Sequence, residues 1–295
     1  ESGTGGSLRI RQRFGKWSFN NADFQAEWTL IAVADWGHFQ KWEDAIERRE
    51  SQLEYDLNVR QSRVHWAPAF SWAWDSGFRL ETSAALSQRT REARGTAADS
   101  AYNSPFNTTQ ILPRIGVSQS LGEAWNVFAQ ASTGFSDPTN FENLPTDNTG
   151  TLRAELDPES AWTIETGFRH KKIEVVLYHQ TVNSAIYDDG NDTFKNASSP
   201  TTMRGVEWQV RQSWPRFLIQ ASGAFQFHQG EDGDLQGPDG DLLGSPRWMA
   251  NVQHRWKVWE RNHHWTLSAW TRAVGPTPLN DDGDNHPAYA TANVD

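Results

Sequence analysis

The stretch that decides the fold is residues 162–169, which read Trp-Thr-Ile-Glu-Thr-Gly-Phe-Arg. Trp162, Ile164 and Phe168 alternate with polar or small residues, so a strand with a side-chain period of two places them on one face. The same period recurs at 78–87, 111–119, 125–135, 206–211, 217–228 and 248–258. The sequence therefore predicts an all-β protein with about thirteen antiparallel strands.

Composition narrows the class of protein further. The chain has 295 residues, of which 37% are hydrophobic and 22% charged, and its formal net charge is −10. No apolar run approaches the roughly 18 residues that a membrane-spanning helix needs. Without cysteine there is no disulfide, no thiolate metal site and no cysteine nucleophile. The acidic balance argues against nucleic acid as a partner, because phosphate backbones are bound by clustered Lys and Arg.

The connections between the predicted strands alternate in length. Short turns fall near 75–77, 122–123, 170–172, 213–216 and 260–264, and long polar loops near 40–61, 91–108, 136–157, 187–200, 229–245 and 275–287. An up-and-down transmembrane β-barrel has short periplasmic turns and long extracellular loops. We therefore predict an antiparallel barrel wall of this kind. Within the first long loop, the Glu- and Arg-rich run 41–53 predicts a helical turn or two.

Tryptophan is unusually abundant, with 16 residues, and its positions support a membrane interface. Indole favours that interface because its body is apolar and its N–H needs a polar partner. The alternative is a soluble, Trp-rich β-sandwich that binds or cleaves polysaccharide. The two differ because a barrel exposes on its outer surface a set of side chains that a sandwich buries: Trp162, Ile164, Phe168, Trp208, Val210, Val252 and Trp256. The tryptophans within about three residues of a short turn are Trp72, Trp74, Trp125, Trp214, Trp259 and Trp265.

From about residue 109 onward, a series of segments resembles the C-terminal half of the TonB-dependent outer-membrane receptors. Residues 112–117 read Leu-Pro-Arg-Ile-Gly-Val, and 134–139 read Gly-Phe-Ser-Asp-Pro-Thr. Residues 156–159 read Leu-Asp-Pro-Glu where the family has Leu-Lys-Pro-Glu, and the Glu-x-Gly-x-Arg strand follows at 165–169. Residues 196–198 read Asn-Ala-Ser where the family has Asn-Ala-Gly, and Arg-Gly-Val-Glu follows at 204–207. Segments 244–247 and 287–289 complete the order.

This resemblance implies a fold and a function. Such receptors are plugged barrels of about 22 strands, so we expect residues 1–295 to be a fragment of one barrel domain, without the plug domain and the closing C-terminal strands. The resemblance implies a bacterial outer membrane, with membrane lipid as one partner and the TonB complex, acting through the plug segment, as another. It also implies an importer, not an enzyme, for a scarce nutrient such as a ferric siderophore.

No catalytic or metal-binding constellation stands out. Glu165 and Glu207 alternate onto the polar face among several Arg, which favours a lumen network over a glycosidase pair. The acidic loops 231–234, 239–241 and 281–284 lack the twelve-residue calcium spacing with its terminal Glu, so solvated turns are favoured and calcium is left open. We predict no cofactor and no metal site.

Ligand capture would fall to the long-loop end and the upper lumen, where aromatic rings stack on a ligand and Arg pairs with anionic oxygens. Loop packing or lumen ion pairs are the alternative roles of these side chains. The candidates are Trp42, Tyr55, Arg89, Tyr102, Phe106, Phe141, Arg153, Tyr187, Phe194 and Arg204.

Overall fold

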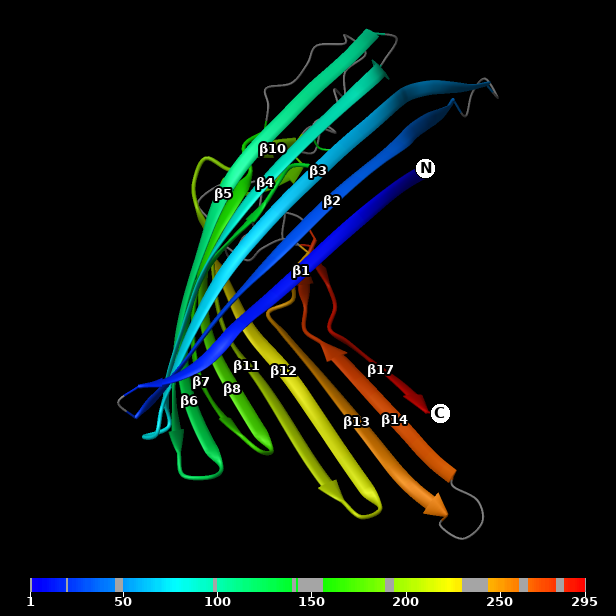
Figure 1. Cartoon of the computed structure of the whole chain (residues 1–295). Coiled ribbons are helices and arrows are strands. Elements are labelled where there is room, and N and C mark those ends of the chain that lie inside the picture. The colour runs from blue at the N-terminus through cyan, green and yellow to red at the C-terminus, as the bar shows by residue number, and fades with distance from the viewer. Residues whose placement is uncertain are drawn as a thin grey trace.

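The computed structural model of the chain describes residues 2–19, 21–45, 50–97, 100–139, 142, 156–188, 194–229, 244–259, 265–279 and 284–294. Thirteen strands form one sheet, and two short hairpins stand beside it (Figure 1). No helix in these ranges is long and apolar enough to cross a membrane. The strands of the large sheet are β1 (Ser2–Phe19), β2 (Ala22–Ala45), β3 (Glu50–Trp74), β4 (Phe78–Ala97), β5 (Ser100–Leu121), β6 (Trp125–Ser136), β7 (Glu159–His170), β8 (Ile173–Asn183), β11 (Thr201–Trp214), β12 (Phe217–Gln229), β13 (Trp248–Trp259), β14 (Trp265–Val274) and β17 (Tyr289–Val294).

Each strand of the large sheet pairs antiparallel with the next, so the topology is up-and-down. The small hairpins are β9 (Ile186–Asp188) with β10 (Phe194–Asn196), inserted before β11, and β15 (Thr277–Pro278) with β16 (Asn285–His286), inserted before β17. The sheet curves round so that its edge strands β1 and β17 both lie on its open side (Figure 1). One continuous curved sheet is a barrel wall and not the paired sheets of a sandwich, which confirms the predicted fold class.

Two sequence-based predictions near the first long loops are wrong. The run 41–53 is not helical in the described residues, because β2 continues to Ala45 and β3 begins at Glu50, where the two strands still pair. Likewise β4 runs to Ala97 and β5 begins at Ser100, so most of 40–61 and 91–108 is strand and not loop. Cross-strand pairing binds backbone N–H and C=O groups along these segments, and this outweighs the helix propensity of Glu and Arg.

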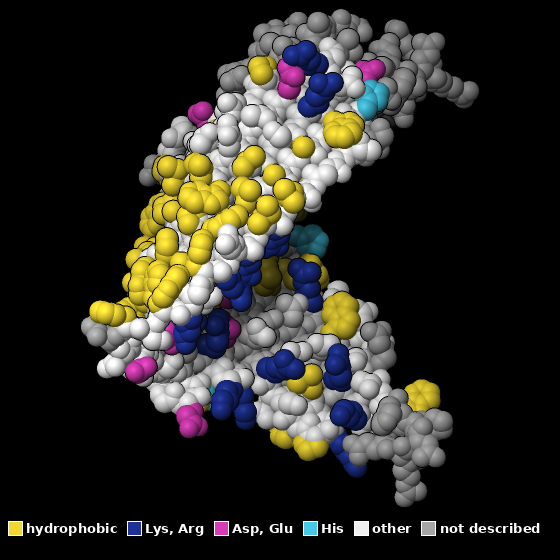
Figure 2. Space-filling model, viewed as in Figure 1, with side chains coloured by type: hydrophobic (Ala, Val, Ile, Leu, Met, Phe, Trp, Pro, Cys, Tyr) yellow, Lys and Arg dark blue, Asp and Glu magenta, His cyan; other side chains and the backbone are white. Residues whose placement is uncertain are grey.

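The two faces of the sheet differ in polarity as predicted. Trp162 is 38% exposed and Ile164 48% exposed, which fits an outer surface. Residues that pair directly across two strands lie on the same face of the sheet. Phe168 pairs with Val175, and Val175 pairs with Trp208, so all three lie on this outer face. Figure 2 shows apolar side chains gathered on the convex side over β1 and its neighbours, and Lys and Arg side chains in the hollow below them. The register also places Val210, Val252 and Trp256 on the outer face.

Aromatic rings gather on the outer face beside the short turns. Trp17 and Phe24 stack with ring centroids 5.5 Å apart, and Phe24 lies 5.2 Å from Trp72. On the far side of the sheet, Phe217 lies 5.3 Å from Trp214 and 5.4 Å from Trp256. This belt has the composition and position of the aromatic girdle of a membrane barrel.

Candidate functional site

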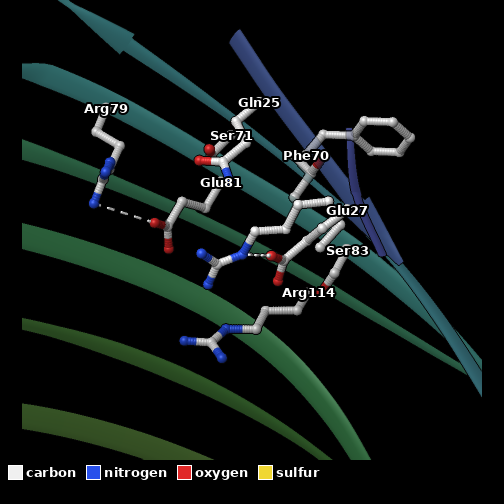
Figure 3. Close-up of a pocket in the computed structure, with 11 residues that line it drawn as sticks. Gln25, Glu27, Phe70, Ser71, Arg79, Glu81, Ser83 and Arg114 are labelled. Atoms are coloured by element: carbon white, nitrogen blue, oxygen red, sulfur yellow. Dashed lines mark hydrogen bonds and ion pairs between the residues drawn. The ribbon is translucent and has the colours of Figure 1, made fainter. Parts of the chain in front are cut away.

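The concave face is charged at its short-turn half, where five strands line a cavity of about 330 Å3 (Figure 3). Arg13 Nε of β1 donates to Glu27 Oε2 of β2 at 3.1 Å. On β4, the Arg79 Nη1 and Glu81 Oε1 atoms lie 3.6 Å apart. Arg114 projects from β5 toward the same space (Figure 3). Three guanidinium groups against two carboxylates leave this cavity with an excess of positive charge.

Arg114 also begins a chain of hydrogen bonds that crosses to the next strands. Its Nη2 donates to Gln130 Oε1 of β6 at 2.7 Å, and Gln130 Nε2 donates to Glu165 Oε2 of β7. Glu165, Tyr178 and Glu207 line a second, larger concavity of about 610 Å3 together with Arg114. Glu165 is thus held by an amide within a polar wall, which agrees with the predicted lumen network.

At the long-loop half, the wall carries a buried polar network. Arg89 Nη1 donates to Asp137 Oδ2 at 3.0 Å, with the two side chains 17% and 2% exposed. Arg89 Nη2 also donates to Gln61 Oε1 at 3.1 Å, and Gln61 Nε2 donates to Asp35 Oδ2 at 2.6 Å. The remaining oxygen of Asp137, Oδ1, is buried without a hydrogen-bond partner in the described part of the chain.

Phe106 and Arg91 stand next to this network. The Arg91 guanidinium lies 4.9 Å from the centroid of the Phe106 ring, a cation–π distance, and Arg91 Nη1 donates to the carbonyl oxygen of Pro138. The segment at Asp137 and Pro138 is therefore fastened to β4 by two arginines. The structure thus brings together two of the predicted ligand residues, Arg89 and Phe106, on the inner face of neighbouring strands.

Tyr187 and Phe194, two further candidates, lie on the β9–β10 hairpin. The position of this hairpin is set by Asn196, which was not among the predicted site residues. Asn196 Nδ2 donates to the carbonyl oxygens of Asp157 at 2.9 Å and Ser184 at 2.8 Å, and its Oδ1 accepts from the Asp157 N–H at 2.8 Å. One amide side chain thus ties the chain before β7 to the hairpin between β8 and β11. The resemblance marked Asn196 as part of a turn motif, but the partner 39 residues away is visible only in the fold.

Arg204 requires a correction, because it lies on the opposite face from the lumen. Glu207 and Met203 line the inner concavity, and successive residues of a strand alternate between faces. Arg204 therefore points outward, with His179 and Phe227 as its cross-strand neighbours. Residues 204 and 207 are three positions apart on one strand, so their side chains lie on opposite faces, and the prediction did not take this into account.

The other candidates fall beyond what can be placed. Phe141 and Arg153 lie outside the described residues, as do most of the acidic positions of loops 231–234, 239–241 and 281–284. The backbones of Trp42, Tyr55 and Tyr102 belong to the long-loop ends of β2, β3 and β5, but their side chains lie outside the described part.

A curved antiparallel sheet with an aromatic belt, an apolar outer face and a charged inner face defines the wall of a large transmembrane β-barrel. The chain belongs to the TonB dependent receptor-like, beta-barrel family, whose model matches residues 2–295. This is a family of outer-membrane receptors and transporters, not of enzymes. A search of curated protein sequences finds no match.

Solved structures of similar fold include three siderophore receptors. The ferric yersiniabactin uptake receptor FyuA from Yersinia pestis has a TM-score of 0.69 at 14% identity, over 99% of this chain and 46% of that one. The ferric preacinetobactin receptor BauA from Acinetobacter baumannii has a TM-score of 0.71 at 13% identity, and the match covers 99% of this chain and 47% of BauA. The ferric-catecholate import receptor Fiu from E. coli K12 has a TM-score of 0.70 at 13% identity, and the match covers 99% of this chain and 48% of Fiu. The chain thus spans about half the length of each.

Proposed function

We propose that this chain forms the wall and ligand-facing loops of an outer-membrane importer that takes up a ferric siderophore with energy from the TonB complex. The observation that carries the proposal is the contrast between the two faces of the sheet. The outer face is apolar with an aromatic belt, while the inner face gathers Arg13, Arg79, Arg89 and Arg114 in a chain whose net charge is −10. A positive lumen suits an anionic ligand.

The chemistry of the inner wall supports an iron chelate as the ligand. Many ferric chelates carry carboxylate or catecholate oxygens, and the planar guanidinium group binds such oxygens in a bidentate way. Phe106, together with Tyr187 and Phe194 on the β9–β10 hairpin, adds aromatic surface at the long-loop end. Arg89, held in place by Asp137 and Gln61, adds a guanidinium group at the same end of the inner wall. The likeness to siderophore receptors is consistent with this ligand class.

The proposal extends to partners of the wall. Edge strands β1 and β17 expose unpaired backbone groups, which are costly in lipid, so we propose that both pair with further strands of a larger barrel. A plug segment inside that barrel would contact the charged concave face and transmit force from the TonB complex.

Uptake of radioactive iron tests the proposal. The full-length protein would be expressed in a bacterium that lacks its own siderophore receptors, with and without a working TonB complex, and a panel of ferric siderophores would be supplied. We expect accumulation of 55Fe from at least one chelate, and only in the strain with TonB. If no chelate is accumulated while copper or haem is, the ligand class is wrong. Uptake that persists without TonB would contradict the energised mechanism.

A further inference from the structure

Three arginines stand at alternate positions of β1. Residues 8–13 read Leu-Arg-Ile-Arg-Gln-Arg, and β1 pairs with β2 in unbroken register over this stretch. Arg13 lines the cavity on the concave face, so Arg9 and Arg11, at alternate positions before it, face the same side. Ile10, between them, is 41% exposed on the convex side. The inner face of β1 therefore carries a row of guanidinium groups, and Figure 2 shows Lys and Arg side chains in the hollow beside this strand.

Positive charge continues along the inner face toward the long-loop end. Arg63 of β3 pairs directly with Arg89 of β4, so the two side chains lie on the same face. Like charges in directly opposed positions repel each other. Asp137 compensates Arg89, at a distance of 3.0 Å between Nη1 and Oδ2, whereas no carboxylate in the described part of the chain forms an ion pair with Arg63. The wall itself thus leaves the charge of Arg63 uncompensated.

Arg9 and Arg63 lie near one another on this face. Arg9 of β1 and His65 of β3 both pair with Ile31 of β2, so these three residues are at one level. Arg63 is two residues further along β3 toward the long-loop end. A strand spacing of about 4.8 Å and a rise of about 3.3 Å per residue put the Cα atoms of Arg9 and Arg63 about 12 Å apart. Two arginine side chains that reach toward each other over this distance can bind the two ends of one small molecule.

The carboxylates beside these arginines compensate only part of the charge. Glu27 accepts hydrogen bonds from two of the arginines, at 2.7 and 3.1 Å, and Glu81 lies 3.6 Å from a third. The other three, Arg9, Arg63 and Arg114, form no ion pair within the described ranges. The whole set is called the arginine track below and consists of Arg9, Arg11, Arg13, Arg63, Arg79 and Arg114.

We propose that the arginine track binds a small anion with two or more carboxylate or phosphate groups in the middle of the wall. Arg9 and Arg63 each hold one group of the anion, in the bidentate geometry that guanidinium shares with both kinds of group. A hollow lined by charge of one sign also concentrates ions of the opposite sign. This position lies below the long-loop rim, where the ligand of the proposed function is captured. The inference rests on the proposed function only in taking the concave face as a lumen open to water.

Equilibrium dialysis of the full-length protein, purified in detergent, tests the proposal. The probes are radiolabelled citrate and radiolabelled pyrophosphate, which carry the two kinds of group, with radiolabelled glucose as the uncharged probe. We expect wild type to bind at least one of the anions and not glucose. Arg9→Gln and Arg63→Gln should each bind that anion about tenfold more weakly, because each loses one charge-assisted contact. The anion that binds more tightly identifies the group as carboxylate or phosphate.

Matched variants keep the test decisive. Arg9 and Arg63 are both exposed and lie on different strands, so the two Gln variants are independent of each other. Arg60→Gln is the control, because Arg60 lies three residues from Arg63 on β3 and therefore on the opposite face, and it should bind as wild type does. Arg63→Lys keeps the charge without the planar fork and should bind within about threefold of wild type. Equal binding by wild type and both Gln variants, or an equal loss in Arg60→Gln, would overturn the proposal.

Ionic strength provides a second readout. Raising the salt concentration from about 0.1 M to about 1 M shortens the screening length from about 10 Å to about 3 Å. Anion binding to the arginine track should therefore weaken steeply over this range. Binding that does not change with salt would mean that charge is not its cause and would overturn the proposal.

Iron uptake by the same variants separates this inference from the proposed function. A wild type that accumulates iron from no chelate, yet binds the anion through Arg9 and Arg63, would refute the proposed ligand and leave the arginine track standing. Iron uptake without anion binding by the full-length wild type would refute the arginine track alone, because another part of the protein would then occupy this face.

Discussion

Asn196 is the residue whose replacement should loosen the long-loop rim most selectively. Asn196→Asp keeps an oxygen that accepts from the Asp157 N–H but removes both hydrogen bonds donated by Nδ2. The new carboxylate oxygen would also face the carbonyl oxygens of Asp157 and Ser184. The β9–β10 hairpin, which carries Tyr187 and Phe194, would then open more often than in the wild type.

The size of the effect follows from the hydrogen bonds lost. A hydrogen bond contributes about 1 kcal/mol net, so losing two lowers the free energy of local opening by about 2 kcal/mol. Because Asn196 is only half-buried, water recovers part of the loss, and the repulsion between oxygens adds to it. A change of about 2 kcal/mol corresponds to about thirtyfold faster exchange of the amide hydrogens that the hairpin protects.

Hydrogen–deuterium exchange read by mass spectrometry measures this opening. The informative amide is that of Ala197, which donates to the Ala185 carbonyl oxygen at 2.7 Å. Asn183→Asp is the matched control, since Asn183 lies at the same rim but makes one long bond of 3.5 Å to Ser160 Oγ. We expect less than about threefold faster exchange in the control. Unchanged exchange in Asn196→Asp, or equal acceleration in the two variants, would refute the role assigned to Asn196.

Three further predictions concern the wall. Arg89→Gln leaves its buried carboxylate partner unpaired, so we expect a loss of about 3 kcal/mol in the free energy of unfolding, measured by urea titration in detergent. Ile164→Arg places a charge on the lipid face and should destabilise the folded barrel in vesicles by about 2–4 kcal/mol, whereas Thr163→Arg on the inner face should be nearly neutral. Gly167→Ala puts a Cβ 2.2 Å from a backbone oxygen and should lower the thermal midpoint, whereas Gly116→Ala, with 3.6 Å to its nearest neighbour, should not.

The outcomes that would contradict these predictions are equally specific. A second mutation that neutralises the carboxylate should restore part of the stability lost in Arg89→Gln, and no restoration would mean that the ion pair is not the cause. Equal effects of arginine at positions 163 and 164 would contradict the assignment of faces. A stable Gly167→Ala would mean that β7 and β8 can separate without cost.

Most of the sheet could be predicted from the sequence because burial imposes a period of two. Where the outer face meets lipid and the inner face meets water, as at Trp162 and Ile164, the alternation is strict and the strands were predicted correctly. Near Ala45 and Ala97 both faces of the strands are polar in sequence, so the period disappears although the backbone pairing continues. The sequence pattern alone therefore predicts loops and a helix in these segments.

The candidate site could be predicted less well than the fold. The face that Arg204 occupies could be predicted from the sequence, because Arg204 lies an even number of residues from the outward-facing Trp208 on the same strand. The partners of Arg89 and Asn196 were not, because Asp137 and Asp157 are 48 and 39 residues away and meet them only once the strands are in register. The two-residue spacing of Glu165 and Gly167 resembles a family motif, and the structure explains its glycine by the close approach of the β8 backbone.

The unequal strand lengths give the wall a tall side and a low side. β2 to β5 have 24, 25, 20 and 22 residues, whereas β6, β7 and β8 have 12, 12 and 11. A tilted strand crosses the bilayer in about 9–11 residues, so about half of each long strand rises above it. With the wall placed in a bilayer as proposed, this raised portion would stand clear of the membrane surface on the long-loop side. A bulky solute would then meet the inner face of β2 to β5 before it reached the level of the membrane.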